Sequence, residues 1–531
     1  MKNIQVSKAL LADLRERNIH FQPARLSAEE RRSLLEGFHP DHNPSGFSTL
    51  PAGPNRGESV PHELCRLLSA HSRVRDLKDL SMLPQDETEV LVIGGGGAGV
   101  VAALEAEQCG AAVTLVTKLR TGDSNTVMAE GGIQAAVRDG DSPVQHFLDS
   151  YGGGGFSAKR ELVSALVNDA PEAIAWLSGL GVSFDRGPEG ELLVTAGGGT
   201  SRRRMLSARD TTGAEIMRTL KDELLHRPHI CIVEHTAAVE LLTDGDGRIS
   251  GALLLHLPTN RLSVLRCRAL VLATGGSGQL RIGGFATSNH RSATGDGLVM
   301  AYRAGARLCS AGSFQYHPTG VAYPHAMVGS LVTEKVRALG ARLVNRYGEV
   351  FVHPLEPRDV TTAAVLRECT ERDCGIQTRD GVAVWLDTPM IERIHGPGTV
   401  EARLPHTLKR FLHFGIDVRR EPILVYPTLH YQNGGIDITP EGRSTTVENL
   451  FAAGEVTGGI HGNNRLMGNA LLDVVVFGRR AGRAAAEAAK GLTPGEGSLS
   501  HVCSFEQALA DVGIDSAETA PILFPIFDHR T

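Results

Sequence analysis

Three glycines at the spacing G-x-G-x-x-G form the clearest chemical signal in this sequence. They are Gly94, Gly96 and Gly99, and they directly follow a short apolar segment, residues 89–93. In such a turn the first glycine allows a tight bend, the second lets the backbone approach a pyrophosphate, and the third lets a helix pack closely on a strand. The phosphates lie at the N-terminus of that helix. The spacing therefore predicts a dinucleotide site.

The elements that position this turn can be predicted from the residues around it. Residues 89–93 form a strand, residues 100–109 a helix and residues 112–117 a second strand, which together make a β-turn-α-β unit. One feature departs from the common pattern. The second strand ends in Thr117-Lys118, where an acidic residue often holds the ribose hydroxyls. Either another group serves the ribose, or the binding mode differs.

Three later segments repeat this strand-and-turn chemistry. Residues 268–276 form a buried-type strand that runs into a glycine turn, residues 294–297 open another helix, and residues 448–455 form a strand that ends in Gly-Glu. Their types and order are similar to those of large flavoproteins of the two-dinucleotide-binding type, in which the last strand returns the chain to the flavin.

Six further motifs make a resemblance to one family specific. Over about residues 88–487 the sequence resembles the flavoprotein family of fumarate reductase, succinate dehydrogenase and L-aspartate oxidase. The family often places Ser or Thr before Lys at the strand end, as in Thr117-Lys118. The motifs that carry the resemblance are Asn125 to Ile133, His317-Pro-Thr-Gly320, Thr333-Glu334, Pro357-Arg-Asp359, His430-Tyr431 with Gly434-Gly435, and His461 to Leu466.

The resemblance implies FAD as the cofactor. Its motifs, carried over to this chain, assign to the FAD site the residues Gly94, Gly96, Ala98, Gly99, Thr117, Lys118, Asn125, Thr126, Ala129, Glu130, Gly131, Gly132, Ala237, Thr274, Gly275, Asp296, Glu455, Asn469, Ala470 and Leu471.

A small dicarboxylate needs cationic and hydrogen-bond donor groups at both of its ends. Arg supplies bidentate geometry and His adds a donor. His317, Thr333, His430 and Arg465 are of the right types and stand in loop-like or glycine-rich contexts. The resemblance implies that these four residues hold the carboxylates of fumarate or succinate.

The resemblance also implies how the proton moves. Arg358 would protonate one alkene carbon while the flavin delivers a hydride to the other, and Glu334 and Arg337 would return the proton to Arg358. The stretch from Thr333 to Arg337 preserves the T-E-x-x-R spacing of the soluble fumarate reductases. Residues 338–341 depart from the glycine-rich continuation of that motif.

Three departures from the family pattern bear on the subtype. Asn125 stands where the complex-type enzymes carry a His that bonds covalently to the flavin, so we expect non-covalent FAD and a preference for fumarate reduction. Ala196 or Gly197 stands where L-aspartate oxidases carry an acid for the substrate amino group. The long helical C-terminal domain of the family is reduced here to residues 493–531 or missing.

The predicted fold class is α/β, with a large Rossmann-like FAD-binding domain and an inserted α+β capping domain. Helical periodicity at residues 7–17 and 27–38, the latter with a Ser27/Glu30 capping box, marks the start of an extension that continues through a loop at 40–61 to a possible helix at 61–74. The predicted organisation is an N-terminal extension at 1–85, FAD-binding segments at 86–312 and 428–492, a cap at 313–427 and a tail at 493–531.

Composition excludes several function classes. The net charge of −6 shows no basic excess, which argues against nucleic-acid binding. The eight cysteines form no C-x-x-C pattern, which argues against an iron–sulfur module or a c-type haem. The start of the chain lacks a signal-peptide pattern, and no apolar run reaches the roughly 18 residues of a membrane span. We therefore expect a cytoplasmic protein with no direct membrane span.

Several functions remain open beside a fumarate reductase. One is L-aspartate oxidase, against which the uncharged Ala196 and Gly197 argue. Another is a flavin dehydrogenase that acts on a different enoate. A third, from another class, is a flavin-bearing electron-transfer or scaffold subunit, which would have no use for Arg358, Glu334 or His430. In each case we expect either a soluble reductant or a separate electron-donor protein. The extension at 1–85 is either a docking surface for that donor or an arm that packs on its own chain.

Overall fold

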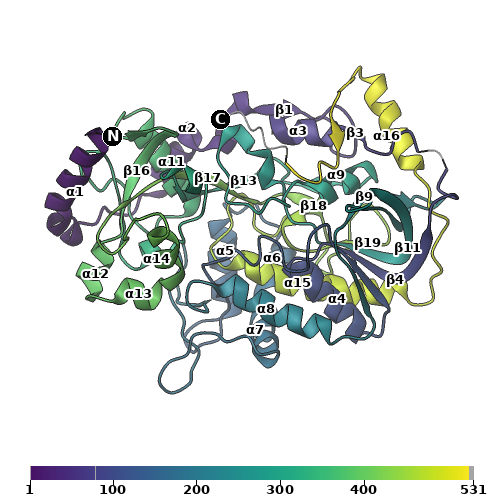
Figure 1. Cartoon of the computed structure of the whole chain (residues 1–531), viewed down its shortest axis with the longest axis horizontal. Coiled ribbons are helices and arrows are strands. Elements are labelled where there is room, and N and C mark those ends of the chain that lie inside the picture. The colour runs from purple at the N-terminus through teal and green to yellow at the C-terminus, as the bar shows by residue number, and fades with distance from the viewer. Residues whose placement is uncertain (1, 78, 526–531) are drawn as a thin grey trace.

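A computed structural model describes residues 2–77 and 79–525 of the chain (Figure 1). Its main layer is a mixed sheet of seven strands in the order β8-β5-β4-β11-β10-β9, with β19 paired to β11. The neighbours β8, β5, β4, β11 and β19 run parallel, and β9 and β10 run antiparallel. The strands are β4 (Gln85–Ile93), β5 (Val113–Val116), β8 (Ile230–Val233), β9 (Thr236–Thr243), β10 (Ile249–His256), β11 (Arg261–Leu272) and β19 (Leu450–Ala452).

Two helices, α4 (Gly97–Gln108) and α15 (Asn469–Ala489), pack against each other beside this sheet (Figure 1). Glycines on α15 permit the close approach, since a Cβ at Gly482 would lie 2.3 Å from the carbonyl oxygen of Ala102. The end of β4, from Val90 to Ile93, is apolar and buried, as expected for a strand covered on both faces. The predicted β-turn-α-β unit is thus present as β4, α4 and β5, with β4 beginning four residues before residue 89.

A second, antiparallel sheet of five strands lies beside the first. Its order is β13-β17-β16-β14, with β15 paired to β16, and β17 runs through residue 427, where the sequence analysis ended the cap. Helix α11 (Arg358–Cys369) packs on this sheet. The strands are β13 (Phe314–Val321), β14 (Arg342–Val344), β15 (Ile376–Thr378), β16 (Gly381–Asp387) and β17 (Ile423–Gln432).

Helices α1 and α2, within residues 2–40, pack on this second sheet and its helices. Helix α1 (Lys2–His20) buries Leu11, and its Ser7 Oγ accepts a hydrogen bond from Trp385 Nε1 at 2.9 Å. Helix α2 (Ala28–Phe38) has the predicted capping box and contacts α11. The region therefore packs on its own chain, as the second of the two readings of the extension predicted.

The rest of the extension is less irregular than expected. The segment predicted as a loop contains a two-stranded ribbon, β1 (Phe47–Thr49) with β2 (Ser59–Pro61). Helix α3 (His62–Leu68) is shorter than the possible helix at 61–74, because the chain turns after it into strand β3 (His71–Ser72). Strand β21 (Thr519–Ala520) pairs with β3, so the C-terminal segment returns to the extension.

The remaining elements surround the two sheets. No helix among residues 2–77 and 79–525 has the length and apolar composition of a bilayer span. The helices include α5 (Pro143–Gly153), α6 (Arg160–Asn168), α7 (Ala170–Gly179), α8 (Thr212–Leu225), α9 (Asp296–Arg303), α10 (Lys335–Ala338), α12 (Met390–His395), α13 (Thr399–Arg403), α14 (Pro405–Leu412) and α16 (Ser500–Asp511). The short strands are β6 (Ile133–Gln134), β7 (Met205–Leu206), β12 (Leu308–Cys309), β18 (Gly435–Asp437) and β20 (Thr457–Gly458).

Candidate active site

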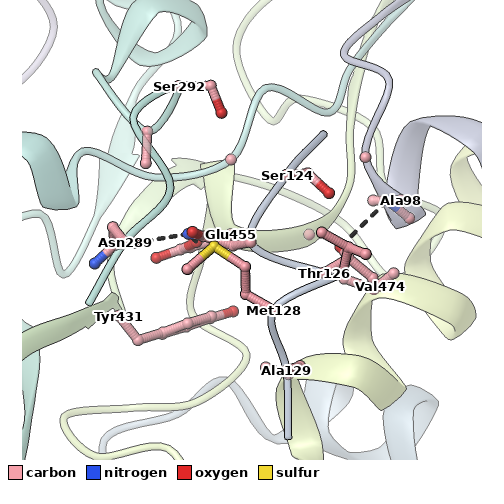
Figure 2. Close-up of a pocket in the computed structure, with 18 of the residues that line it drawn as sticks. Ala98, Ser124, Thr126, Met128, Ala129, Asn289, Ser292, Tyr431, Glu455 and Val474 are labelled. Carbon is pink, nitrogen blue, oxygen red and sulfur yellow. Dashed lines mark hydrogen bonds between the residues drawn. The ribbon is translucent and has the colours of Figure 1, made fainter. Parts of the chain in front are cut away.

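A cavity of about 590 Å³ extends from the glycine turn of the first sheet to the strands of the second. This volume is in the range of sites for cofactors and small molecules. Figure 2 shows Ala98, Thr126 and Val474 grouped on one side of the cavity, and Asn289 and Tyr431 on the other. Helices α4 and α15 therefore contribute to one wall of the site, and strand β17 contributes to the opposite wall.

Most of the residues predicted to bind the cofactor line this cavity. Gly99 and Asn469 do not line it: Gly99 lies within α4, and the side chain of Asn469 donates to Ser150 Oγ at 2.9 Å instead. The predicted residues in the wall are Gly94, Gly96, Ala98, Thr117, Lys118, Asn125, Thr126, Ala129, Glu130, Gly131, Gly132, Ala237, Thr274, Gly275, Asp296, Glu455, Ala470 and Leu471.

The turn between β4 and α4 has the properties that a pyrophosphate requires. Gly94 has φ +121°, and a Cβ there would lie 2.2 Å from the carbonyl oxygen of Ala273. Helix α4 begins at the N-cap Gly96, which provides no side-chain hydrogen bond to the first turn. The N–H of Gly97 donates to Thr126 Oγ1 at 3.2 Å, and the other N–H groups of that turn are available to an anion. Beside the turn, the buried Thr274 Oγ1 has no hydrogen-bond partner among the described residues. This cradle fits a dinucleotide.

The end of strand β5 obtains its carboxylate from another element. Lys118 Nζ lies 2.6 Å from Asp296 Oδ2, at the start of α9, and donates to the carbonyl oxygen of Leu523 at 2.7 Å. Asp296 also lines the cavity. A carboxylate from about 180 residues later in the chain thus lies beside the strand end, where the local pattern has none.

Asn125 is held at the cavity wall by three hydrogen bonds. Its amide nitrogen donates to Asn289 Oδ1 at 2.7 Å and to Glu455 Oε2 at 3.1 Å, and its oxygen accepts from the backbone N–H of His290 at 2.6 Å. Figure 2 shows Asn289 and Glu455 at this wall. The Asn125 side chain is an amide, which has no nucleophilic nitrogen. Both its nitrogen and its oxygen are engaged in hydrogen bonds within the protein.

Two histidines from neighbouring strands face each other at the far end of the cavity. The rings of His317 on β13 and His430 on β17 are 5.2 Å apart and nearly perpendicular. Burial, followed by the nearby Arg358, holds the pKa of both imidazoles well below the ordinary value. The N–H of Thr319 points at His317 Nδ1, which makes Nδ1 an acceptor and leaves the proton on Nε2. That buried Nε2 has no partner in the part of the chain that the structure describes, so it can donate to a ligand.

Arg465 and Arg358 converge on a residue that the sequence analysis did not select. Gln315 Oε1 accepts from Arg465 Nη2 and from Arg358 Nη1, each at 3.0 Å, and its amide nitrogen donates to Asn464 Oδ1 at 2.9 Å. Gln315 precedes His317 by two positions on β13, so the two side chains lie on one face of the strand. In a strand, alternate residues share a face, so the position of Gln315 two residues before His317 could have identified it as a site residue.

Arg358, Glu334 and Arg337 form a buried ionic cluster. Arg358 Nε donates to Glu334 Oε2 at 2.8 Å, and Arg337 Nη2 lies 3.5 Å from the same oxygen. Burial raises the pKa of Glu334, but the charges of Arg358 and then Arg337 outweigh it, and the net pKa lies below the ordinary value. Glu334 and Arg358 line the cavity, and Arg337 lies behind them.

This end of the cavity carries an excess of positive charge. Burial and the neighbouring Arg358 lower the pKa of Arg465 to about 10, which still leaves it charged at neutral pH. Arg358, Arg465 and Arg337 together carry three positive charges against the one carboxylate of Glu334, and the two histidines are neutral. Glu455 also faces Arg465, so the arginines outnumber the facing carboxylates by at least one, and a buried site with this excess of positive charge suits a carboxylate ligand.

A second acid–base pair in the wall was only half identified from the sequence. Glu130 was assigned to the cofactor, but its partner Arg410 on α14 was not, and Arg410 Nη1 donates to Glu130 Oε1 at 2.9 Å. Burial raises the pKa of Glu130 to about 7, although Arg410 opposes the shift. The two residues are 280 positions apart, so no local pattern could have joined them.

The loop at residues 195–204 contacts the cluster of Arg358, Glu334 and Arg337 through a backbone N–H group and not through a charged side chain. The N–H of Gly198 donates to Glu334 Oε1 at 2.8 Å. Ala196 and Gly197 carry no charge, and the nearby Arg204 is paired with Asp141 at 2.8 Å and with Asp149 at 2.5 Å. Both of these nearby acids are thus already committed to Arg204.

Potential metal ligands and cysteines are scattered over the described residues. Across the described ranges 2–77 and 79–525, no group of three or more His, Cys, Asp or Glu side chains is arranged to hold a metal ion. The eight cysteines are free thiols. Cys369 and Cys374, the nearest pair in the sequence, are not joined to each other.

Comparisons with known proteins agree with this geometry. A family model described as "FAD binding domain" matches residues 89–471. One subunit of the fumarate reductase (CoM/CoB) from Methanothermobacter marburgensis is 41% identical over 76% of this chain and 73% of its own. L-aspartate oxidase of Synechocystis sp. is 39% identical over 74% and 69%. A solved structure of the FrdA protein of E. coli quinol fumarate reductase superposes with a TM-score of 0.73 at 32% identity, over 81% of this chain and 75% of that one.

Proposed function

Because this chain belongs to the FAD-binding family that includes fumarate reductase and L-aspartate oxidase flavoproteins, we propose that it reduces the double bond of a small dicarboxylate such as fumarate. The chain is an FAD-dependent oxidoreductase of the fumarate reductase and succinate dehydrogenase type. The relatives at about 40% identity include both reductases and oxidases, so the substrate rests on the site itself.

The residues of the glycine turn would hold the FAD pyrophosphate, with Asp296 and Lys118 at the strand end beside it. Bound FAD supplies hydride transfer to or from the substrate. Asn125 offers an amide at this wall, so we propose that the cofactor is held without a covalent bond. The protein's part is to bind both partners and to manage the proton.

The substrate would lie at the cationic end of the cavity. Arg465 and Arg358 can each bind a carboxylate through two N–H groups, and His317 Nε2–H is a donor with no partner among the described residues. Gln315 orients the two guanidiniums by accepting a hydrogen bond from each at the same oxygen. Thr333 and His430 complete the set that lines this end.

Arg358 would supply the proton and Glu334 would return it. The carbon next to a carboxylate becomes strongly basic when a hydride adds to its neighbour, and only such a base can take a proton from a guanidinium. The neutral Arg358 would then be reprotonated by Glu334, which lies 2.8 Å from its Nε, with a proton that the ionised Glu334 first takes up from Arg337. Arg337, behind Glu334, is the next group in the relay.

One observation carries the proposal: Arg358 contacts both Glu334 and Gln315 in a cavity that also contains the glycine turn. A protein that only transfers electrons has no use for a buried arginine paired in this way. L-aspartate oxidase stays the second candidate because of the 39% identical relative. Its substrate carries an ammonium group, for which the wall offers Glu130, although Arg410 already pairs with that carboxylate.

An anaerobic assay separates these functions. Purified protein with FAD is mixed with reduced viologen dye and fumarate, and in parallel with succinate and an oxidised dye; L-aspartate oxidation is measured separately with oxygen. Dye oxidation that depends on fumarate and exceeds the other two rates supports the proposal. Activity with L-aspartate alone would move the assignment to the oxidase, and no activity with any of the three would refute both.

A further inference from the structure

Helix α2, together with the segments on either side of it, and the loop that carries Arg358 are bound to each other. We call residues 21–41 the strap and residues 353–358 the donor loop. The backbone N–H of Leu26 donates to Glu356 Oε1 at 2.8 Å, and Arg31 Nη2 lies 2.8 Å from Glu356 Oε2. Gln22 Nε2 lies 2.7 Å from His353 Nε2. Three strap residues therefore contact two residues of a six-residue loop.

The buried carboxylate of Glu356, at the centre of this contact, is compensated by groups of the strap. The side chain of Glu356 is 0% exposed, whereas that of Arg31 is 32% exposed. A buried carboxylate is costly unless a cation or several donors compensate it. The Leu26 N–H, which donates to Glu356 Oε1, and the Arg31 guanidinium, which forms an ion pair with Oε2 without hydrogen-bond geometry, both come from the strap.

The donor loop is held between the strap and the active site. On its inner side, Arg337 Nη1 donates to the carbonyl oxygen of Pro354 at 2.5 Å. Glu356 is two residues before Arg358, and Arg358 is the first residue of α11. The strap also reaches the neighbouring strand, since Asp41 Oδ2 accepts from the N–H of Phe314 at 3.0 Å, next to Gln315. A shift of the loop would therefore move Arg358 relative to both Glu334 and Gln315.

We propose that Arg31 is a positioning residue for the proton donor: through Glu356 it fixes the donor loop so that Arg358 meets Glu334 and the substrate in the productive geometry. The inference deepens the proposed function and rests on it. The strap lies outside residues 89–471, so this device is an addition to the part of the chain that the family shares. Proton transfer is sensitive to displacements of a fraction of an ångström, which makes support from outside the site effective.

The test compares Arg31→Gln with Arg31→Lys, and uses Arg32→Gln as the matched control because Arg32 is the next residue of α2 and is exposed. Each protein is purified with FAD, and its flavin content is measured first. We expect kcat for fumarate reduction to fall roughly tenfold or more in Arg31→Gln, with KM changed less than about twofold. Arg31→Lys should recover most of the rate, and Arg32→Gln should match the wild type.

Two further readouts distinguish positioning from general damage. Reoxidation of the dye-reduced enzyme by ferricyanide needs no proton on carbon, so Arg31→Gln should leave that rate unchanged. Hydrogen exchange of the backbone at residues 353–362 should become faster, with exchange elsewhere in the chain unaltered. A folded Arg31→Gln protein with wild-type kcat, or one that loses the ferricyanide and fumarate reactions equally, overturns the inference.

The inference stays testable if Arg31→Gln does not fold, and also if the wild-type protein does not reduce fumarate. If Arg31→Gln does not fold, Glu356→Gln removes the same ion pair while it keeps an acceptor for the Leu26 N–H, and it should show the same pattern. If the wild-type protein reduces no fumarate, the proposed function fails. The hydrogen-exchange comparison then decides the positioning inference alone, because unchanged exchange at residues 353–362 in Arg31→Gln refutes it whatever the substrate.

Discussion

Arg358 donates its Nε–H to Glu334 Oε2 at 2.8 Å, and both side chains are almost fully buried. Glu334 is bound in addition by the N–H of Gly198 and lies 3.5 Å from Arg337. The carboxylate is thus kept ionised next to the guanidinium that is proposed to lose a proton. This pairing makes the first prediction specific.

Substitution of Arg358 by Gln should abolish fumarate reduction without loss of FAD. The amide keeps a donor near Gln315 but has no ionisable proton for the substrate, so we expect kcat to fall by several orders of magnitude. Steady-state assays and flavin absorbance measure the two properties. Arg367→Gln, in the last turn of α11, serves as the control. Turnover near the wild-type rate would assign the proton to another group.

Substitution of Arg465 should weaken binding as well as rate. Its guanidinium contacts Gln315 and lies 4.2 Å from the centre of the Tyr431 ring, so it is held rigidly in the cavity. Loss of a charge-assisted bond to a carboxylate costs about 1.5–3 kcal/mol, which corresponds to roughly a 10- to 150-fold rise in KM or the dicarboxylate Kd. Titration of the flavin spectrum with malonate measures binding directly, and an unchanged affinity in Arg465→Gln would show that the carboxylates bind elsewhere.

FAD should leave the protein on acid denaturation. Asn125 carries an amide that bonds Asn289 and Glu455, and an amide forms no covalent link to the flavin. We expect yellow flavin in the supernatant after precipitation with trichloroacetic acid, in an amount equal to the flavin bound before. Flavin fluorescence that stays with the denatured chain would mean that a different residue forms a covalent bond.

L-aspartate should be a poor substrate. Ala196 and Gly197 offer no charge to its ammonium group, and the nearby Asp141 and Asp149 are paired with Arg204. An ammonium without a counter-charge in a buried site is costly. We expect kcat/KM for L-aspartate oxidation at least about a hundredfold below that for fumarate reduction, from a penalty of roughly 3 kcal/mol. Comparable values would favour the oxidase assignment, with Glu130 as the next residue to test.

Asp41 should make the protein less stable as the pH rises. Burial, with a smaller contribution from Asp359, raises the pKa of Asp41 to about 8. The folded protein therefore holds a proton that the unfolded chain releases above about pH 4. Because the folded state binds more protons in this window, stability falls as pH rises from about 4 to about 8, by up to roughly 1.4 kcal/mol per pH unit.

The variant Asp41→Asn isolates this effect. Its thermal midpoint should rise relative to that of the wild type between about pH 5 and about pH 8, while Asp76→Asn, at an almost fully exposed carboxylate, should follow the wild type. A constant difference between Asp41→Asn and the wild type across this range would show that Asp41 is ionised in the folded protein.

The sequence by itself determined the local parts of this protein. The glycine turn, the helix after it and the capping box of α2 depend on residues within a few positions of each other, so their spacing was enough to predict them. The motifs around His317, Arg358 and His430 were assigned by resemblance to the family, and these three residues line one cavity. The α/β fold followed from the β-turn-α-β unit and from the same resemblance.

Only the tertiary structure decided which distant residues meet. Gln315 joins Arg358 to Arg465, Arg410 pairs with Glu130, and Asp296 reaches Lys118. These contacts arise because helices, strands and loops far apart in the chain pack around one cavity, and that packing depends on the whole buried core. The strap is a further case. Its helix α2 was predictable, but its contact with the donor loop was not, since a buried carboxylate at Glu356 becomes evident only when the fold removes it from water.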